Sequence, residues 1–321
     1  MGAAMVHALI NFTRRLAFYV FRTIAKPLMG TGIGLRCRPL GKAFEHLRRL
    51  VIAEDLVLME VEGSKMYLKP REHTFATALL LGKAYEKCET DLFNEAVEEG
   101  MVVIDCGANI GYYTLLAAKL VGERGKVFAF EPEPSNYALL VKNIEVNGYS
   151  NVVPIRKAIT DRTGTIKLSL ADDPSGHSIG QIDRAHARGV MMVDSVTLDE
   201  FLKQNITPID VIKMDIEGAE MRALDGMENI IRQNPDLKII TEFCPFYMEK
   251  CGSSAATYFE RLKSHGFKIY VIDEHRQCLE MVSNVKQVTK LIHELAVSLL
   301  CQRTPYTGQF LCESKQRIIL K

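Results

Sequence analysis

The chain has 321 residues, of which 47% are hydrophobic and 25% charged, so it can bury one large α/β core and is too apolar to be intrinsically disordered. The net charge of +1 is unevenly distributed. Residues 1–44 hold no acidic residue, and removing their seven Lys and Arg from the 40 basic residues leaves 33 against 39 acidic residues. A mildly acidic body disfavours a polyanionic partner held by bulk electrostatics, so no nucleic acid is expected as a partner.

The first predicted element is a basic amphipathic helix within Met5–Leu28, which with the glycine-rich loop after it forms a leading region over residues 1–44. Arg14 and Arg15 interrupt its apolar run, so it is too short to span a membrane and differs from the core of a secretory signal. Three interpretations are compatible with it: a helix on an anionic membrane surface, a helix packed on its own domain, and a mitochondrial transit peptide. The first would give a peripheral membrane contact.

An extension is predicted over residues 45–90. Val57–Val61 and Lys65–Leu68 flank three turn residues and predict a small β-hairpin. Thr74–Lys87 is predicted to be one helix that leads into the last domain, residues 91–321.

The last domain alternates apolar runs typical of buried strands with segments typical of helices, which predicts a Rossmann-like α/β fold with a mostly parallel sheet. The predicted strands are Val102–Cys106, Lys126–Glu131, Val152–Arg156, Val211–Asp215, Lys238–Phe243 and Phe267–Ile272, and the predicted helices are Tyr112–Leu120, Ser135–Asn147, Leu198–Gln204, Ala219–Asn229 and Ser254–Ser264. Thr165–Leu170 is predicted to be an extra hairpin arm. Ala171–Val190 is predicted to be a long loop, of a length usually found in functional lids or disordered insertions.

A glycine turn follows the first of these strands, in the pattern D-x-G-x-N-x-G formed by Asp105, Gly107, Asn109 and Gly111. Glycine permits a sharp turn and close approach of a ligand. A dinucleotide-binding turn would have glycine in place of Asn109 and would avoid a carboxylate such as Asp105 beside the phosphates. An acidic strand end suits a cofactor that carries an amino group and a cation, such as S-adenosylmethionine (SAM).

A second carboxylate supports this interpretation. Glu131 ends the neighbouring strand about twenty residues after the turn, where a carboxylate can accept hydrogen bonds from both hydroxyls of a ribose. The turn alone would suit an ordinary strand–turn–helix junction. The turn together with Asp105 and Glu131 predicts a cofactor site.

Three segments carry a resemblance to a known family: VIDCGANIG at Val103–Gly111, FAFEPEP at Phe128–Pro134 and DVIKMDIEGAE at Asp210–Glu220. With them, the chain resembles the FkbM-type SAM-dependent methyltransferases, a class I group that acts largely on hydroxyls. The opening segment Tyr85–Thr90 is also similar, and the likeness extends to about Tyr270. The resemblance implies a seven-stranded, mostly parallel sheet with helices on both faces.

The resemblance also implies roles for the residues of the turn. Asp105 would lie near the amino group of the cofactor, Asn109 would fix the turn that Gly107 and Gly111 shape, and Glu131 would hold the ribose. Backbone near Ala158 would meet the adenine ring.

Acceptor chemistry needs other residues, because an alcohol is a poor nucleophile at neutral pH without a base or a metal. Asp215 and Glu217 end the fourth strand, where they could act as base and orienting group or bind a divalent cation. His177, in the predicted long loop, is another candidate base, and Glu242 ends an apolar strand where its carboxylate needs a partner. Glu220 is expected to stabilise the start of its helix instead.

The eight cysteines show no metal-binding spacing, and free thiols in a reducing compartment are expected. The expected location is therefore cytoplasmic, including the membrane surface.

The function expected from these features is O-methylation of a small molecule, a sugar or a glycolipid. Three alternatives are N-methylation of a peptide or amine, an NAD-dependent oxidoreductase, which Asp105 and Asn109 disfavour, and a non-catalytic adaptor that retains the fold. The sequence Asp215–Gly218 replaces the Asp/Asn-Pro-Pro-aromatic tetrapeptide of amide and base N-methyltransferases, which counts against the first alternative.

Overall fold

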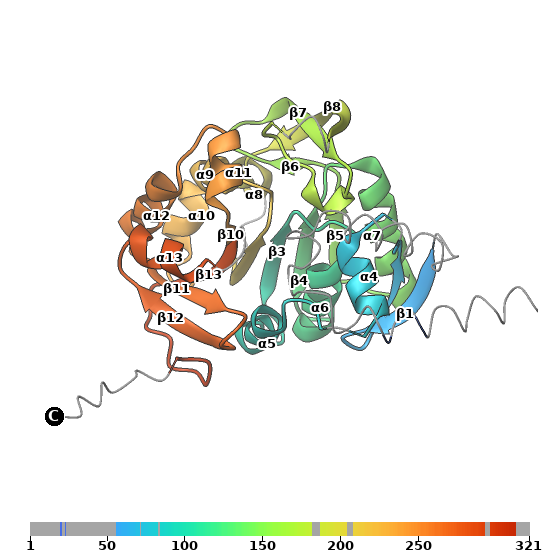
Figure 1. Cartoon of the computed structure of the whole chain (residues 1–321), viewed down its shortest axis with the longest axis horizontal. Helices are drawn as coiled ribbons and strands as arrows, with labels where there is room; N and C mark the ends of the chain where they lie inside the picture. The colour runs from blue at the N-terminus through green and yellow to red at the C-terminus, as the bar shows by residue number, and fades with distance from the viewer. Residues whose placement is uncertain are drawn as a thin grey trace, which may run out of the picture. The chain divides into compact units, whose positions relative to one another are not determined.

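The computed structural model describes residues 20, 23, 56–70, 72–82, 84–181, 187–203, 208–292 and 296–312 (Figure 1). Apart from Val20 and Thr23, the predicted helix within Met5–Leu28 and its following loop lie outside these residues. The chain divides into two compact units, residues 1–85 and 86–321. In the part that the structure describes, no helix combines the length and the apolar character needed to cross a bilayer.

The first unit contains the predicted hairpin, formed by β1 (Val57–Val61) and β2 (Ser64–Leu68) in antiparallel pairing. The predicted helix Thr74–Lys87 is wrong in its extent. α4 (Thr74–Leu80) stops early, Gly82 follows with a φ of 74°, and a separate helix begins at Lys87. A left-handed glycine two residues after a helix is a common way for the helix to end.

The second unit is built on an eight-stranded sheet in the order β12-β11-β13-β10-β9-β3-β4-β5 (Figure 1). β10, β9, β3, β4 and β5 run parallel to one another, β13 runs antiparallel between β10 and β11, and β12 is an antiparallel edge strand. The strands are β3 (Val102–Cys106), β4 (Lys126–Phe130), β5 (Val152–Ile155), β9 (Val211–Met214), β10 (Lys238–Phe243), β11 (Lys268–Asp273), β12 (Cys278–Val282) and β13 (Val297–Gln302). The predicted Rossmann-like fold is confirmed, with one strand more than the seven expected.

The helices are α5 (Lys87–Ala96), α6 (Tyr112–Val121), α7 (Pro134–Asn147), α8 (Leu198–Leu202), α9 (Glu220–Asp225), α10 (Glu228–Gln233), α11 (Pro245–Lys250), α12 (Ala255–Ser264) and α13 (Val285–Leu291). The predicted helix Ala219–Asn229 is two helices, because Gly226 ends α9. A Cβ at Gly226 would lie 2.3 Å from the Thr160 carbonyl oxygen, so this position requires glycine.

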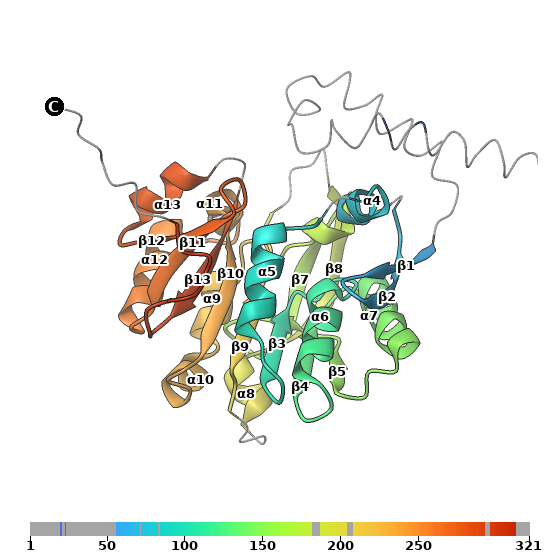
Figure 2. The ribbon, with the colours of Figure 1, turned by 90° about the horizontal axis from the view of Figure 1, so that it is seen from below.

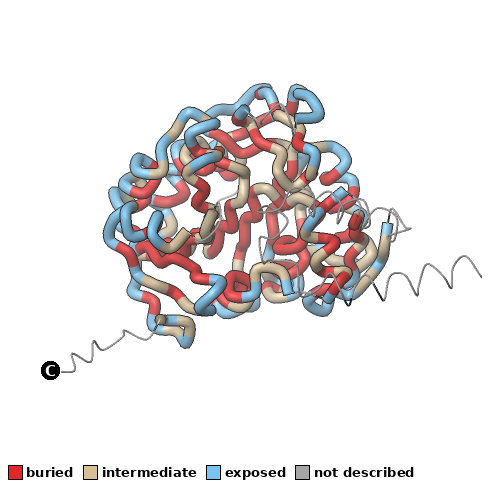
Figure 3. The backbone as a smooth tube through the Cα atoms, in the orientation of Figure 1, coloured by how far each residue is buried: buried red, intermediate tan, exposed pale blue. Residues whose placement is uncertain are grey.

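Helices cover both faces of the sheet, and its central strands are buried (Figure 3). Ile104, Ile212 and Ile239 belong to a core that includes residues of α8, α9, α10, α12 and α13. Successive strand residues point to opposite faces, so Asp105 and Lys213 face the other side. On that side α6 contacts β3 and β4, and Figure 2 shows α5 and α6 on the near side of the sheet.

A separate three-stranded sheet has the order β6-β8-β7, formed by β6 (Ala158–Ile159), β7 (Gly164–Ala171) and β8 (Ala187–Val196). β7 confirms the predicted hairpin arm. The predicted loop Ala171–Val190 is partly wrong, because it contains the 3-10 helix η1 (Pro174–Gly176) and the first residues of β8. β8 was missed because apolar side chains occur on both of its faces, among them the exposed Val190 and Met192.

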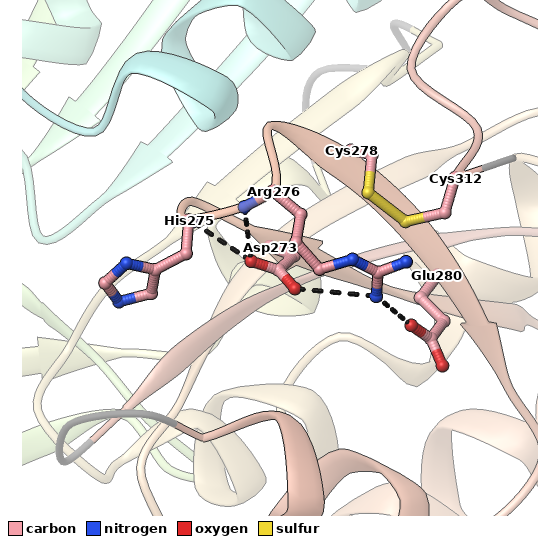
Figure 4. The surroundings of a disulfide bond; sticks show 6 residues. All are labelled: Asp273, His275, Arg276, Cys278, Glu280 and Cys312. Atoms are coloured by element: carbon pink, nitrogen blue, oxygen red, sulfur yellow. Dashed lines mark hydrogen bonds and ion pairs between the residues drawn. A yellow bond between two sulfur atoms is a disulfide. The ribbon is translucent and has the colours of Figure 1, made fainter.

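The expectation that the cysteines are free thiols is wrong for one pair: Cys278 of β12 and Cys312 form a disulfide (Figure 4). The backbone N–H of Cys312 also donates to the Leu279 carbonyl oxygen at 2.9 Å, so the segment that carries Cys312 lies beside β12. Their sequence separation of 34 gave no signal for this pairing. Five other described cysteines, Cys88, Cys106, Cys244, Cys251 and Cys301, form no disulfide.

Candidate functional site

The glycine turn after β3 is fixed by backbone contacts to two neighbouring strands. Gly107, Asn109 and Gly111 all have left-handed backbones, with φ of 84°, 50° and 101°. The N–H groups of Gly107 and Ala108 donate to the Phe130 carbonyl oxygen at 3.0 and 2.9 Å. A Cβ on Gly107 would lie only 1.8 Å from the Asp215 carbonyl oxygen. Gly107 is therefore needed for the close approach of the end of β9 to the turn.

Glu131, after the end of β4, has its carboxylate oriented by two backbone donors. Asn109 N–H donates to Oε2 and Glu133 N–H to Oε1, both at 2.9 Å. Burial raises the pKa of Glu131 to about 8, although both backbone donors act to lower it. Each carboxylate oxygen can accept a second hydrogen bond, so the two ribose hydroxyls predicted from the sequence are compatible with this geometry.

The side chain of Asn109 supplies a further acceptor. Its buried Oδ1 has no hydrogen-bond partner. Such an unpaired buried acceptor is unfavourable unless a ligand donates to it. Asn109 Oδ1 and the Glu131 carboxylate therefore fit a ligand that carries several hydrogen-bond donors, as SAM does with its amino group and ribose hydroxyls.

Asp105 is buried in β3 and accepts a hydrogen bond from Thr114 Oγ1 of α6 at 2.5 Å. Burial raises its pKa to about 6, while Thr114 and the charge of Lys213 lower it. Asp105 is thus a carboxylate held on the face that α6 covers, beside the glycine turn. Its role near a cofactor amino group, which the family resemblance implies, stays a prediction.

Lys213, which we did not predict to be a site residue, lies opposite Asp105 in the β3–β9 register. It is buried, and its Nζ lies 2.9 Å from Glu89 Oε1 and 3.8 Å from Asp215 Oδ2. Nζ also lies 4.7 Å from the centre of the Tyr113 ring. A lysine inside an apolar strand, between Ile212 and Met214, was the signal that could have identified it.

Asp215 follows β9, and its N–H donates to the Cys106 carbonyl oxygen at 3.0 Å, so it lies at the carboxyl ends of β3 and β9. Its side chain is 34% exposed, against 2% for those of Lys213 and Glu89. Burial raises the pKa of Asp215, and the Lys213 ammonium opposes this effect. Asp215 is the member of this group that an acceptor can reach.

Glu217 and Glu242 add two further carboxylates near Asp215. Burial raises the pKa of both well above the ordinary value, and the charge of Asp215 raises each of them further. Glu242 Oε2 is buried and without a hydrogen-bond partner. Glu217 has a left-handed φ of 54°, and its carbonyl oxygen accepts a hydrogen bond from Ser178 Oγ at 2.6 Å. The structure thus brings these two predicted residues together with Asp215.

Glu220 stabilises the turn rather than extending toward an acceptor. Its Oε1 accepts hydrogen bonds from Ile216 N–H at 3.1 Å and Gly218 N–H at 3.3 Å. Burial raises its pKa to about 7, and these donors lower it. Its place in the first turn of α9 is the one expected from the sequence.

His177 and Ala158 are placed differently from the carboxylates. The Nδ1 of His177 accepts the backbone N–H of Ala171 at 3.0 Å, and burial lowers its pKa. The neighbouring Ser178 holds this segment against Glu217, but the His177 ring is already engaged with its own loop. Ala158 is buried in β6, where it pairs with Ser195.

Metal ligands do not converge in the described ranges, where no three side chains of His, Cys, Asp or Glu are grouped as a metal site would require. The arrangement offers instead a partly exposed carboxylate, Asp215, together with Glu217 and Glu242, which are also only partly buried. Such a carboxylate can take a proton from a hydroxyl group placed next to it.

Comparison with known proteins gives a family match over residues 105–269, to the model described as the methyltransferase FkbM domain. The chain is 29% identical over 142 residues to the hexuronic acid methyltransferase AglP of Haloferax volcanii, which covers 44% of this chain and 56% of that protein. It is 25% identical over 190 residues to Methyltransferase 1 of Beauveria bassiana, covering 53% of this chain and 73% of that protein. The matched stretch therefore spans little more than half of the first of these relatives.

Among solved structures, the methyltransferase FkbM from Methylobacillus flagellatus is similar with a TM-score of 0.39 and 15% identity, covering 67% of this chain and 50% of that one.

Proposed function

The chain belongs to the FkbM methyltransferase family, and on that premise we propose that it uses SAM to methylate a hydroxyl group of a sugar or glycolipid. The observation that supports the proposal is the grouping of acceptors at the carboxyl ends of β3, β4 and β9. Asp105, Glu131 and Asn109 Oδ1 lie on the cofactor side, and the partly exposed Asp215 lies beside them. Ligands of open α/β sheets bind at this edge.

The cofactor side would be held by groups that are already oriented. Glu131 would accept hydrogen bonds from the ribose hydroxyls, while Asn109 Oδ1 and Asp105 would accept hydrogen bonds from the amino group. When bound, SAM supplies an electrophilic methyl carbon, whose bond to sulfur breaks with the electron pair left on sulfur as the acceptor oxygen bonds to that carbon. The residues of this side bind and align and take no proton.

Asp215 would act on the acceptor. Its carboxylate takes the hydroxyl proton as the oxygen attacks, so the negative charge of the base is neutralised while the cofactor loses its positive charge. Glu217 and Glu242 surround Asp215 with further carboxylates. An acidic environment disfavours an anionic acceptor, so we favour a neutral sugar ring over a uronate, even though one relative is named for hexuronic acid.

A second candidate function, N-methylation of an amine, is favoured by the same acidic environment, because carboxylates attract an ammonium group. Amino sugars would therefore be methylated on nitrogen rather than oxygen. Mass spectrometry of the product distinguishes the two positions.

The experiment begins with calorimetric titration of the full chain with SAM, with NAD as the control. Saturable binding of SAM and no response to NAD are expected. Transfer is then measured as formation of the demethylated cofactor with neutral glycosides, uronates and amino sugars, with Asp215→Asn as background. Binding of NAD in place of SAM would overturn the proposal. Transfer to the nitrogen of amino sugars alone would favour N-methylation, and SAM binding without transfer to any hydroxyl or amine would favour the adaptor alternative.

We also propose a peripheral membrane contact through Met5–Leu28, supported by the acid-free, basic composition of that segment. Deleting residues 1–29 should reduce sedimentation with anionic liposomes and leave sedimentation with neutral liposomes unchanged. The predicted cytoplasmic location depended on free cysteines, and the Cys278–Cys312 bond removes that basis, because disulfides persist mainly in oxidising compartments. Alkylation of cell extracts followed by mass spectrometry would show whether this pair is oxidised in vivo.

A further inference from the structure

Lys213 is a buried cation in the middle of a central strand, only 1% exposed. Transfer of an ammonium group from water into a protein interior is unfavourable unless carboxylates and hydrogen bonds compensate it. Burial alone would lower the pKa of Lys213, but the charges of Glu89 and Asp215 raise it above its ordinary value. Lys213 is therefore charged, and its charge is placed between these two carboxylates.

The two carboxylates are held very differently. Glu89 is as buried as Lys213, and its Oε1 lies 2.9 Å from Nζ. The start of α5, which carries Glu89, is itself fixed, because the Glu274 carboxylate accepts the N–H groups of Cys88 at 3.0 Å and Glu89 at 2.8 Å. Asp215 lies farther from Nζ, at 3.8 Å, and is the partly exposed partner. One partner thus anchors the lysine, and the other faces the acceptor.

Lys213 also links the two sides of the site. It lies opposite Asp105 in the strand register, and its charge lowers the pKa of Asp105 as well as that of Asp215. The charged groups that act on Asp215 and its neighbours come from α5 and the residue before it, β3, β9 and the turn that follows it, α9, the residue before η1, and β10. Apart from Lys213, they are the acidic groups Glu86, Glu89, Asp105, Asp173, Glu217, Glu220 and Glu242. The charge of one lysine therefore acts against a strongly acidic surrounding.

We infer that Lys213 is a positioning residue of methyl transfer, whose ammonium keeps Asp215 charged and directed toward the acceptor. The inference rests on the proposed role of Asp215 as the base. A base must be deprotonated before it can accept a proton, and burial among carboxylates opposes deprotonation. Without the ammonium, burial and the surrounding carboxylates would raise the pKa of Asp215 further, so a smaller fraction of it would be ionised and able to take the proton of a hydroxyl. The nearby Tyr113 ring, 4.7 Å from Nζ, further stabilises the cation in place.

The test is the dependence of kcat on pH. For an essential base, kcat rises with pH and then levels off, and the midpoint reports the pKa of the base in the bound complex. Lys213→Met should move this midpoint upward by about one pH unit or more, which lowers kcat about tenfold on the acidic side and restores it at high pH. KM for the acceptor should change much less than kcat. Lys213→Arg, which retains the charge, should recover part of the shift.

Glu89 provides a matched control of opposite sign. The charge of Glu89 raises the pKa of Asp215, so Glu89→Gln should move the midpoint downward while Lys213 stays in place. Because Lys213→Met leaves Glu89 buried without its cation, that variant is at risk of misfolding. The double variant Lys213→Met/Glu89→Gln removes both buried charges and should fold, as checked by circular dichroism and thermal melting. It should retain an upward shift if Lys213 acts on Asp215.

The outcomes separate the inference from the proposed function. If Asp215→Asn retains normal turnover, Asp215 is not the base and the proposed mechanism fails. If Asp215→Asn is inactive, while the folded double variant has the wild-type midpoint and Glu89→Gln leaves it unmoved, Lys213 is only a structural partner of Glu89. Opposite shifts for the lysine and glutamate variants would support the inference, since loss of packing alone would not give them.

Discussion

The two sides of the candidate site stabilise their carboxylates in different ways. On the cofactor side, Glu131 accepts hydrogen bonds from two backbone N–H groups, and Asp105 accepts one from a threonine hydroxyl. On the acceptor side, Glu242 Oε2 is unpaired and Asp215 faces the charge of Lys213. The first side is organised by hydrogen bonds before any ligand binds, whereas the second depends on balanced charge. Binding and chemistry should therefore respond differently to mutation and to pH.

The largest expected effect is on the acceptor side. Asp215→Asn keeps the size of the side chain but cannot accept the hydroxyl proton, so kcat should fall about 100- to 10,000-fold. SAM affinity, measured by calorimetry, should stay within about threefold, because the groups proposed to hold the cofactor are unchanged. A threefold change corresponds to less than the roughly 1.4 kcal/mol that a tenfold change in affinity requires. Glu220→Gln is the matched control, since Glu220 accepts hydrogen bonds from its own turn. A large loss of SAM affinity in Asp215→Asn would show that the two sides are not separable.

The next largest effect concerns the turn that joins the two sides. In Gly107→Ala, the new Cβ would lie 1.8 Å from the Asp215 carbonyl oxygen at a φ of 84°, so the free energy of unfolding should fall by about 3 kcal/mol or more. Gly148→Ala is the control, because its φ is 68° but no atom lies within 4 Å of its Cβ. It should lose about 1–2 kcal/mol from backbone strain alone. Urea denaturation measures both, and equal losses would show that the approach of β9 to the turn is not tight.

A smaller effect is expected on the cofactor side. Asp105→Asn can still accept from Thr114 but lacks the negative charge, and a hydrogen bond to a charged group contributes about 1.5–3 kcal/mol. The Kd for SAM should therefore rise about 10- to 100-fold in calorimetry. Asp91→Asn, an exposed carboxylate of α5 that pairs with Lys87, is the control and should bind SAM normally. Unchanged affinity in Asp105→Asn would remove Asp105 from the cofactor site.

Much of this site could be predicted from the sequence, because apolar runs mark strands and each run ends at a polar residue. Asp105, Glu131, Asp215 and Glu242 were all placed at strand ends, and the structure agrees. The sequence does show Lys213 as a lysine within an apolar strand, but it does not show which carboxylate compensates the charge, because the partner Glu89 lies far away in the chain on α5.

Other features depend on contacts that no local pattern reveals. The pairing of Cys278 with Cys312 follows from the path of the chain beside β12. The break between α9 and α10 follows from the approach of Gly226 to Thr160, which joins segments distant in sequence. The local pattern therefore identified the elements, while the tertiary contacts decided where they end and which side chains meet.

The smallest expected effect is the pH dependence of stability on the cofactor side. Burial raises the pKa of Glu131 from 4.5 to about 8, so the folded protein retains a proton that the unfolded chain releases. Its contribution to stability is thus complete below pH 4.5 and is lost as pH rises through about 8. The slope of the free energy of unfolding is limited to about 1.4 kcal/mol per pH unit for one group.

Urea denaturation between pH 5 and 8 should therefore show a smaller slope for Glu131→Gln, which stays neutral, than for the wild type. The glutamine variant will have a lower free energy of unfolding at every pH, because its amide nitrogen cannot accept a hydrogen bond from one of the two backbone N–H groups. The slope, and not the absolute stability, is therefore the quantity to compare. Saturating SAM should also flatten the wild-type slope at high pH, since ribose hydroxyls stabilise the ionised carboxylate. Identical slopes for both proteins would mean that the two backbone donors outweigh burial and that Glu131 is ionised before the cofactor binds.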